Sequence, residues 1–211
     1  MQTANFAAQL RRAGIAGRTA MTGNQREAAS RKICAVLAAL PVFQEADVVL
    51  LYRAVRAEVS LSALAQAAQQ AGKLVAYPLC TAPGRMIALA PENDDAWQRG
   101  AFGIWEPVPE RSVQLDGQAL DLIVCPCAGF DSRCHRIGMG GGYYDRFLPS
   151  SRNAAVLAAA FDAQREPEFV PQSWDVPMQA VVTELGVHTP DGCLHTAAEA
   201  AVGSTIFFGH S

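Results

Sequence analysis

Six short runs of apolar residues recur along the chain, separated by more polar segments. Runs of this length without polar alternation are typical of strands that are covered on both faces of a sheet. The runs are residues 48–52, 74–77, 86–90, 122–125, 154–161 and 180–183. We therefore predict six buried strands.

Helical spacing of apolar residues marks other segments. Residues 4–20 place Phe6, Leu10 and Ala13 on one stripe, which we expect to be broken near Gly14 and Gly17. A second helix is expected over residues 25–40, where Pro41 would end it. A third is expected over residues 61–71, with Ser60 as its N-cap and Gly72 as its stop, and a fourth begins at Tyr143.

The order of these elements predicts the fold class. A strand, a helix and a strand follow one another between residues 48 and 77, and such a crossover places its two strands in parallel. We expect an α/β protein with an open, mostly parallel sheet flanked by helices on both faces. Residues 97–107, rich in glycine, proline and aromatic side chains, are expected to be an irregular connection.

Composition limits the class of protein. Half of the 211 residues are apolar, 18% are charged and the net charge is −3. This balance is ordinary for a globular protein and gives no basic footprint for nucleic acid. No apolar run reaches about 18 residues, so we expect no membrane span, and the first residues lack the apolar core of a signal peptide, which favours the cytoplasm. We expect one α/β domain over residues 1–185 and a loose C-terminal tail over 186–211.

Residues 120–148 hold the strongest candidate site. A buried strand runs into a loop with Arg136 and four glycines among positions 138–142, and a helix follows. Such glycines let backbone N–H groups face an anion. The loop is not a Walker A motif, because no Gly-Lys-Ser/Thr follows, and it is a poor dinucleotide fingerprint, because Tyr143 stands at the third glycine position. Arg136 could pair with a phosphate and Asp145 could hold Mg²⁺.

Six cysteines raise the alternatives of disulfides or a metal. The one cluster along the sequence consists of Cys125, Cys127 and Cys134 with His135. Its spacing is not that of paired CxxC motifs, and Cys125 belongs to a buried strand. Scattered reduced thiols are favoured over a zinc site.

At the glycine loop the sequence resembles a known family. Phe130-Asp131, Arg136-Ile137-Gly138 and the run from Gly140 to Leu148 are similar to the signature of 5-formyltetrahydrofolate cyclo-ligases, also called 5,10-methenyltetrahydrofolate synthetases. The resemblance extends more thinly from about Leu10 to Glu184. It implies a three-layer sandwich of the NagB/RpiA/CoA-transferase type. It also implies an enzyme that uses ATP and Mg²⁺ to close 5-formyltetrahydrofolate to 5,10-methenyltetrahydrofolate, with release of ADP and phosphate.

The resemblance also implies roles for individual residues. ATP would be bound by Arg11, Arg136, Gly138, Met139, Gly140, Gly141, Gly142, Tyr143 and Tyr144, of which Arg136, Tyr143 and Tyr144 are the catalytic candidates. The folate would be bound by Glu58 and by the apolar or aromatic side chains of Met86, Phe102 and Trp105, since a flat ring favours such walls. Mg²⁺ would be held by Asp145 and Asp175.

Three positions depart from the family pattern. Ala7 replaces a basic residue, for which Arg12 or Arg18 could substitute, and Gln179 stands where many members carry a second aspartate. Cys134 replaces a glycine, and it would be strained if that position needs a positive φ. These departures leave two alternatives open: a paralogue that acts on another substrate, and a non-catalytic nucleotide-binding or interaction protein. We expect a monomer or a weak homodimer.

Overall fold

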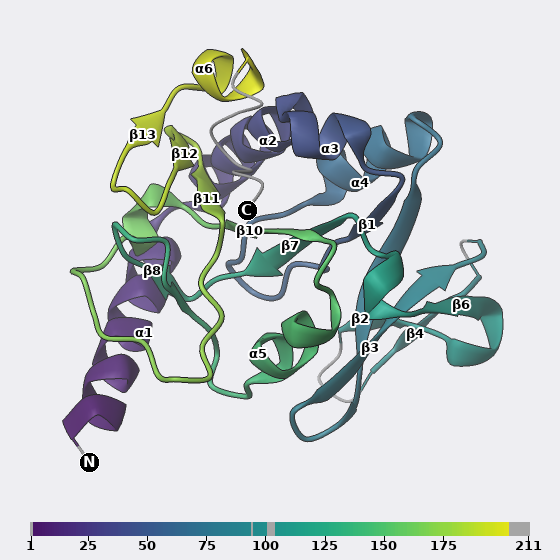
Figure 1. The fold of residues 1–211 in the computed structure, drawn as a ribbon, viewed down its shortest axis with the longest axis horizontal. Helices are drawn as coiled ribbons and strands as arrows, with labels where there is room; N and C mark the ends of the chain where they lie inside the picture. Colours follow the sequence, from purple (N-terminus) through teal and green to yellow (C-terminus); the bar gives the residue numbers. More distant parts are fainter. Residues whose placement is uncertain (1, 94, 101–103, 203–211) are drawn as a thin grey trace.

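A nine-stranded sheet forms the centre of the computed structural model, which describes residues 2–93, 95–100 and 104–202 (Figure 1). Its strands lie in the order β13-β12-β11-β10-β7-β1-β2-β3-β6. Their bounds are β1 Val48–Leu50, β2 Leu74–Ala82, β3 Arg85–Pro91, β6 Ser112–Leu115, β7 Leu122–Pro126, β10 Ala155–Ala159, β11 Ala180–Thr183, β12 Gly186–His188 and β13 Leu194–His195. The six predicted strands are all present.

The five central strands are parallel, and antiparallel strands extend the sheet at both sides. β11, β10, β7, β1 and β2 pair in parallel, for example Leu50 with Ile123 and Leu157 with Val124. β12 and β13 continue the sheet beyond β11, and β3 and β6 continue it beyond β2. The predicted class, an open and mostly parallel sheet, is confirmed.

Alternate residues of the parallel strands face two separate cores, as the period of two requires. On β7, Leu122 and Val124 belong to one core, and Ile123 and Cys125 belong to the other. The first core is covered by α2 Gly23–Ala39, α3 Pro41–Glu45, α4 Ser62–Gln70 and α6 Ala197–Val202. The second is covered by the five-residue helix α5 Tyr143–Phe147 and by the small hairpin of β8 Gly129–Phe130 and β9 Arg136–Ile137. The second face therefore has the thinner cover, and it is where the candidate site lies.

Helix α1, Gln2–Ala20, runs along one side of the molecule and packs on the β8–β9 hairpin (Figure 1). The predicted break near Gly14 and Gly17 is wrong, because the helix is continuous. The two glycines serve packing instead. A Cβ added at Gly14 would lie 2.2 Å from the carbonyl oxygen of Ala128, and one at Gly17 would lie 2.0 Å from that of Ala163.

Two further local predictions need correction, and a third is confirmed. Ser60 is not the N-cap of α4: the cap position is Leu61, without a side-chain hydrogen bond, and the Ser60 hydroxyl contacts that of Ser62 at 3.1 Å. The connection expected over residues 97–107 contains a second hairpin, formed by β4 Trp97–Arg99 and β5 Trp105–Pro107. Gly72 does end α4, with φ of +75°.

The chain after residue 185 also differs from the expected loose tail. β12 pairs with β11, β13 pairs with β12, and Ala200 of α6 is fully buried in the first core. The tail prediction is therefore wrong for residues 186–202, because these residues complete one side of the sheet. Among the described residues, no helix is both long enough and apolar enough to cross a bilayer.

Candidate active site

The order of the sheet reverses beside β1. The chain leaves β1 through α4 to β2 on one side and later returns to β7 on the other side. Open parallel sheets bind ligands in the crevice outside the carboxyl ends of the strands at such a point. Glu58 lies in the loop that follows β1, and Arg136 begins β9 in the hairpin that follows β7, so both side chains come from the segments after the carboxyl ends of these two strands.

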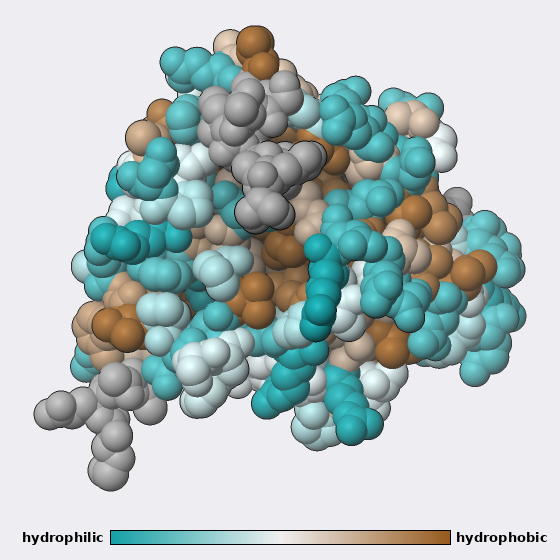
Figure 2. Space-filling view, viewed as in Figure 1, coloured by the Kyte–Doolittle hydropathy of each residue, from teal (hydrophilic) through white to brown (hydrophobic). Residues whose placement is uncertain are grey.

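A cavity of about 340 Å³ opens there. Hydrophobic residues are exposed near the middle of this face of the molecule, with hydrophilic residues around them (Figure 2). Most of the site residues predicted from the sequence line the cavity: Arg11, Glu58, Met86, Arg136, Gly138, Met139, Gly140, Gly141, Gly142, Tyr143, Tyr144, Asp145 and Asp175. Its volume falls within the usual range of small-molecule sites.

The glycine loop is held in place by two arginines. Arg11 of α1 donates from Nε to the carbonyl oxygen of Gly138 at 2.7 Å. Arg146 of α5 donates from Nη1 to the carbonyl oxygens of Gly141 at 2.9 Å and Gly142 at 3.1 Å. Sequence reasoning missed Arg146, although its place one turn into the helix after the glycines was a usable signal. The carbonyls of the loop therefore face these arginines.

Left-handed backbone at two glycines shapes the same loop. Gly140 has φ of +93° and Gly142, the N-cap of α5, has φ of +63°. Side chains rarely adopt such values, which explains why glycines occupy these positions. The loop can thereby turn sharply between Arg136 and Tyr143.

Arg136 and Asp145 form a buried ion pair at the floor of the cavity. Arg136 donates from Nη2 to Asp145 Oδ1 at 2.6 Å, and the two side chains are only 3% and 15% exposed. Among the described residues, Arg136 Nε and the hydroxyl of Tyr144 are buried without a hydrogen-bond partner. Buried polar atoms are normally paired, so these two unsatisfied donors are the kind of group that a bound ligand completes.

Asp175 reaches the cavity from the segment between β10 and β11. Its Oδ2 accepts a hydrogen bond from the N–H of Gln172 at 2.8 Å. The N–H of Val176, the next residue, lies 3.5 Å from Asp145 Oδ1. The structure thus places the two predicted metal ligands at one cavity although they are thirty residues apart in the chain.

Glu58 lines the cavity from the other side of the switch point. Arg18 Nη2 lies 3.7 Å from Glu58 Oε1, and the N–H of Val55 donates to Oε2 at 2.9 Å. Burial raises the pKa of Glu58 despite these two favourable contacts. Burial also raises the pKa of Tyr144 well above its ordinary value, so its hydroxyl keeps its proton.

The residues that depart from the family pattern have distinct surroundings. Ala7 lines the cavity, whereas Arg18 donates from Nη1 to the carbonyl oxygen of Cys127 at 3.1 Å and pairs with Glu58. Gln179 does not line the cavity: its Oε1 accepts from the N–H of Val156 at 2.6 Å. Cys134 is fully buried with φ of +59°, the left-handed conformation in which a side chain is strained.

Of the predicted aromatic folate contacts, Trp105 lies away from this cavity. Trp105 is 45% exposed and lines a separate depression beside Tyr52 and Trp97. Phe102 lies outside the described residues. Sequence reasoning assigned no role to Trp174, which is 67% exposed and lines the cavity beside Asp175.

The side chains of Cys125, Cys127, Cys134 and His135 do not form a metal-binding group among the described residues. Cys127 donates from Sγ to the carbonyl oxygen of Gly129 at 2.8 Å, and Cys134 donates to that of His188 at 3.2 Å. His135 Nδ1 lies 2.9 Å from the carboxylate of Asp131. Burial raises the pKa of the Cys125 and Cys127 thiols to about 12, so both are protonated. All six cysteines are free.

Comparison with known proteins gives a consistent result. A family model described as the 5-formyltetrahydrofolate cyclo-ligase family matches residues 4–184. The chain is 30% identical over 139 residues to the 5-formyltetrahydrofolate cyclo-ligase of Haemophilus influenzae, covering 64% of this chain and 74% of that protein. It is 26% identical over 170 residues to that of Escherichia coli K12, covering 79% and 93%.

Solved structures agree with these relatives. The 5,10-methenyltetrahydrofolate synthetase of Aquifex aeolicus superposes with a TM-score of 0.77 at 27% identity, covering 87% of this chain and 92% of that one. The synthetase of Mycoplasma pneumoniae superposes with a TM-score of 0.70 at 20% identity, covering 84% and 98%, and supports the fold alone.

Proposed function

The chain belongs to the 5-formyltetrahydrofolate cyclo-ligase family, and we propose that it is an ATP- and Mg²⁺-dependent ligase acting on 5-formyltetrahydrofolate. The product would be 5,10-methenyltetrahydrofolate, with ADP and phosphate released. The observation that carries this proposal is the gathering of Arg11, Glu58, Arg136, Asp145 and Asp175 around one cavity.

The glycine loop would bind the phosphates of ATP. Arg11 and Arg136 both supply positive charge beside Gly138, and Arg146 fixes the loop through the carbonyl oxygen of Gly141. Phosphoryl transfer depends mainly on alignment and on neutralising charge, so it needs no covalent group from the protein. Arg136 Nε and the Tyr144 hydroxyl, both unsatisfied among the described residues, would donate to the reacting groups.

The donor set fits magnesium. Two carboxylates, Asp145 and Asp175, line the cavity beside the glycine loop, and carboxylate oxygens are ligands that Mg²⁺ prefers. The carboxylate of Asp145 would then contact both Arg136 and the ion. When bound, Mg²⁺ would supply neutralisation of the phosphate charge.

Glu58 and Met86 would bind the folate at the other end of the cavity. In the proposed reaction the formyl oxygen on N5 attacks the γ-phosphorus, and ADP leaves. N10 then attacks the activated formyl carbon and loses its proton, and phosphate leaves with the former formyl oxygen. The protein's task is to hold N10, the formyl group and the γ-phosphate in line and to keep water out.

Growth of the methenyl chromophore tests the proposal. We expect it to require ATP, Mg²⁺ and 5-formyltetrahydrofolate together, and to be abolished in Asp145→Asn with the fold intact by circular dichroism. Asp116→Asn is the matched control, because Asp116 is exposed and caps a 3-10 turn through Gln118. Unchanged turnover in Asp145→Asn would refute the metal role.

Two other outcomes would favour the alternatives. ATP binding without chromophore would support the non-catalytic protein, and ATP hydrolysis without chromophore would support the paralogue that acts on another substrate. No nucleotide binding at all would overturn both the main proposal and the non-catalytic alternative. The expectations of no nucleic-acid partner, a cytoplasmic location and a monomer or weak homodimer stay predictions.

A further inference from the structure

The hairpin that joins β12 to β13 carries a cluster of three different ligand types. Asp191, Cys193 and His195 each offer one ligand atom, and these atoms all lie within 4.8 Å of one another. They form the one group of three or more such side chains found among the described residues. The hairpin lies after residues 4–184, the part that the family model matches, so no family role accounts for the cluster.

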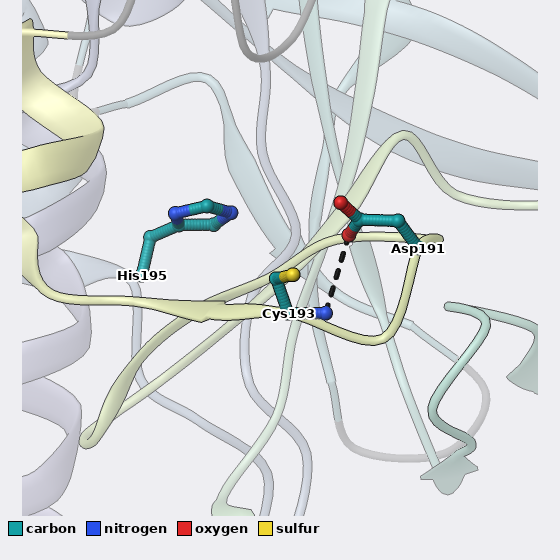
Figure 3. A group of neighbouring side chains, drawn as sticks. All are labelled: Asp191, Cys193 and His195. Carbon is teal, nitrogen blue, oxygen red and sulfur yellow. Dashed lines mark hydrogen bonds between the residues drawn. The ribbon is translucent and has the colours of Figure 1, made fainter.

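Backbone geometry explains why the three side chains meet. Successive side chains of an extended segment alternate between two sides, so Cys193 and His195 share one side of the arm that contains β13, and the turn before it brings Asp191 to the same side. Gly192, with φ of +85°, makes the turn, and its N–H donates to the carbonyl oxygen of Thr189 at 2.9 Å. Figure 3 shows the thiol of Cys193 between the imidazole of His195 and the carboxylate of Asp191.

The hydroxyl of Thr189 contacts two of the three groups. Its hydroxyl donates to Asp191 Oδ1 at 2.5 Å and lies 3.2 Å from His195 Nε2. The N–H of Cys193 also donates to Asp191 Oδ1, at 3.2 Å, which leaves Oδ2 for a cation. Hydrogen bonds of this kind orient the side chains that ligate metals.

The chemistry of the three groups favours a cation. They bring an oxygen, a sulfur and a nitrogen ligand atom together at one exposed turn. A divalent ion between them would be bound by all three.

We propose that Asp191, Cys193 and His195 form a zinc-binding site that ties together the hairpin at this side of the sheet. A thiolate, an imidazole and a carboxylate together suit borderline-soft Zn²⁺ rather than Mg²⁺ or Ca²⁺. Tetrahedral bonds would bring the ligand atoms to about 3.3–3.6 Å from one another, so side chains now within 4.8 Å need to close by at most about 1.5 Å. Asp191 and Cys193 are exposed, so small rotations of their side chains meet no packed neighbours, and water would take the fourth position.

Competition with a chromogenic zinc chelator tests the site on the full-length, untagged and reduced protein. We expect one Zn²⁺ per chain, bound at least roughly tenfold more weakly by Cys193→Ser and by His195→Ala. Cys80→Ser controls for loss of an exposed thiol elsewhere, and Asp145→Asn controls for metal at the candidate active site; both should bind zinc as the wild type does. Since the proposal does not depend on the ligase activity, its result is separable from that of the chromophore assay.

Cobalt substitution gives a second readout that does not depend on stability. Co²⁺ bound by the wild type should show a thiolate-to-metal charge-transfer band, which Cys193→Ser should abolish and Cys80→Ser should keep. Zinc at a hundredfold excess over its Kd should also raise Tm by roughly 5 to 10 °C in the wild type and not in Cys193→Ser. The proposal is overturned if the wild type binds no stoichiometric zinc, if both hairpin variants bind it unchanged, or if Asp145→Asn alone loses it.

Discussion

Gly14 of helix α1 offers the sharpest test of how this fold positions its candidate active site. A Cβ at this position would lie 2.2 Å from the carbonyl oxygen of Ala128, whereas real Cβ atoms essentially never approach a heavy atom within 3.0 Å. The oxygen belongs to the backbone and cannot swing away. Gly14→Ala must therefore push the helix outward by about 1 Å, since the packed interior holds no spare space.

Two opposing contributions set the magnitude. Replacing glycine by alanine inside a helix favours folding by about 1 kcal/mol, and overpacking opposes it by about 1 to 3 kcal/mol. We expect Gly14→Ala to lose about 1 kcal/mol of unfolding free energy, measured by urea denaturation. Gly23→Ala is the matched control, because a Cβ at Gly23 in helix α2 meets nothing within 4 Å; that variant should be unchanged or more stable by up to about 1 kcal/mol.

Activity should fall more than stability. Arg11 lies one helical turn before Gly14 and donates to the carbonyl oxygen of Gly138 at 2.7 Å, so an outward shift of α1 separates the arginine from the glycine loop. Misplacement by about 1 Å costs up to about 100-fold in rate, and we expect kcat/KM for ATP in the chromophore assay to drop roughly 10- to 100-fold. Gly23→Ala should keep full activity. Equal stability and equal turnover in the two variants would refute this reasoning.

Three further variants test single features. Tyr144→Phe removes a buried hydroxyl that has no hydrogen-bond partner among the described residues. Turnover should fall, while the free energy of unfolding from urea denaturation should stay equal or rise by up to about 1 kcal/mol. A clear loss of stability would contradict this expectation. Cys134→Gly should be about 1 kcal/mol more stable than Cys134→Ala. Both variants lose the thiol contact to the carbonyl oxygen of His188, and only glycine relieves the φ of +59°. An alanine variant that is equally stable would show that the strain is absent. Burial lowers the pKa of His188 from 6.5, with Asp162 opposing and Arg165 adding to the shift. The unfolded chain then binds the proton more tightly, so the stability associated with neutral His188 is complete above pH 6.5 and is lost as the pH falls below it. The decline in urea midpoint on acidification should be shallower in His188→Gln. An identical decline in that variant would show that His188 is not its source.

The pattern of apolar runs was enough to locate the parallel strands. Burial on both faces of a sheet demands continuous apolar residues, and β7 and β10 satisfy this without interruption. The glycine loop could also be found, because left-handed backbone at Gly140 and Gly142 leaves few alternatives to glycine.

Features that depend on distant partners could not be predicted in this way. Gly14 and Gly17 suggested a helix break by propensity, but their role is close contact with backbone carbonyls far along the chain. Ser60 matched a cap by residue type, yet its N–H donates to the Ser30 side chain at 3.1 Å, 30 residues away. β12 and β13 are too short to show alternation, so the pairing of β12 with β11 and of β13 with β12 left no signal in the sequence. The same limit applies to Trp105, whose depression is lined by the loop after β1, helix α4 and the β4–β5 hairpin, which only the fold brings together.

The short antiparallel strands beyond β11 have a bearing on association between copies of the chain. β11 consists of four fully buried residues, and without β12 its backbone N–H and C=O groups would form an apolar sheet edge open to pairing with another molecule. β13 is only two residues long and leads at once into α6. On this side the sheet therefore ends in an edge strand that is too short to pair with a further strand. Residues 186–202 thus protect β11 from β-pairing between molecules.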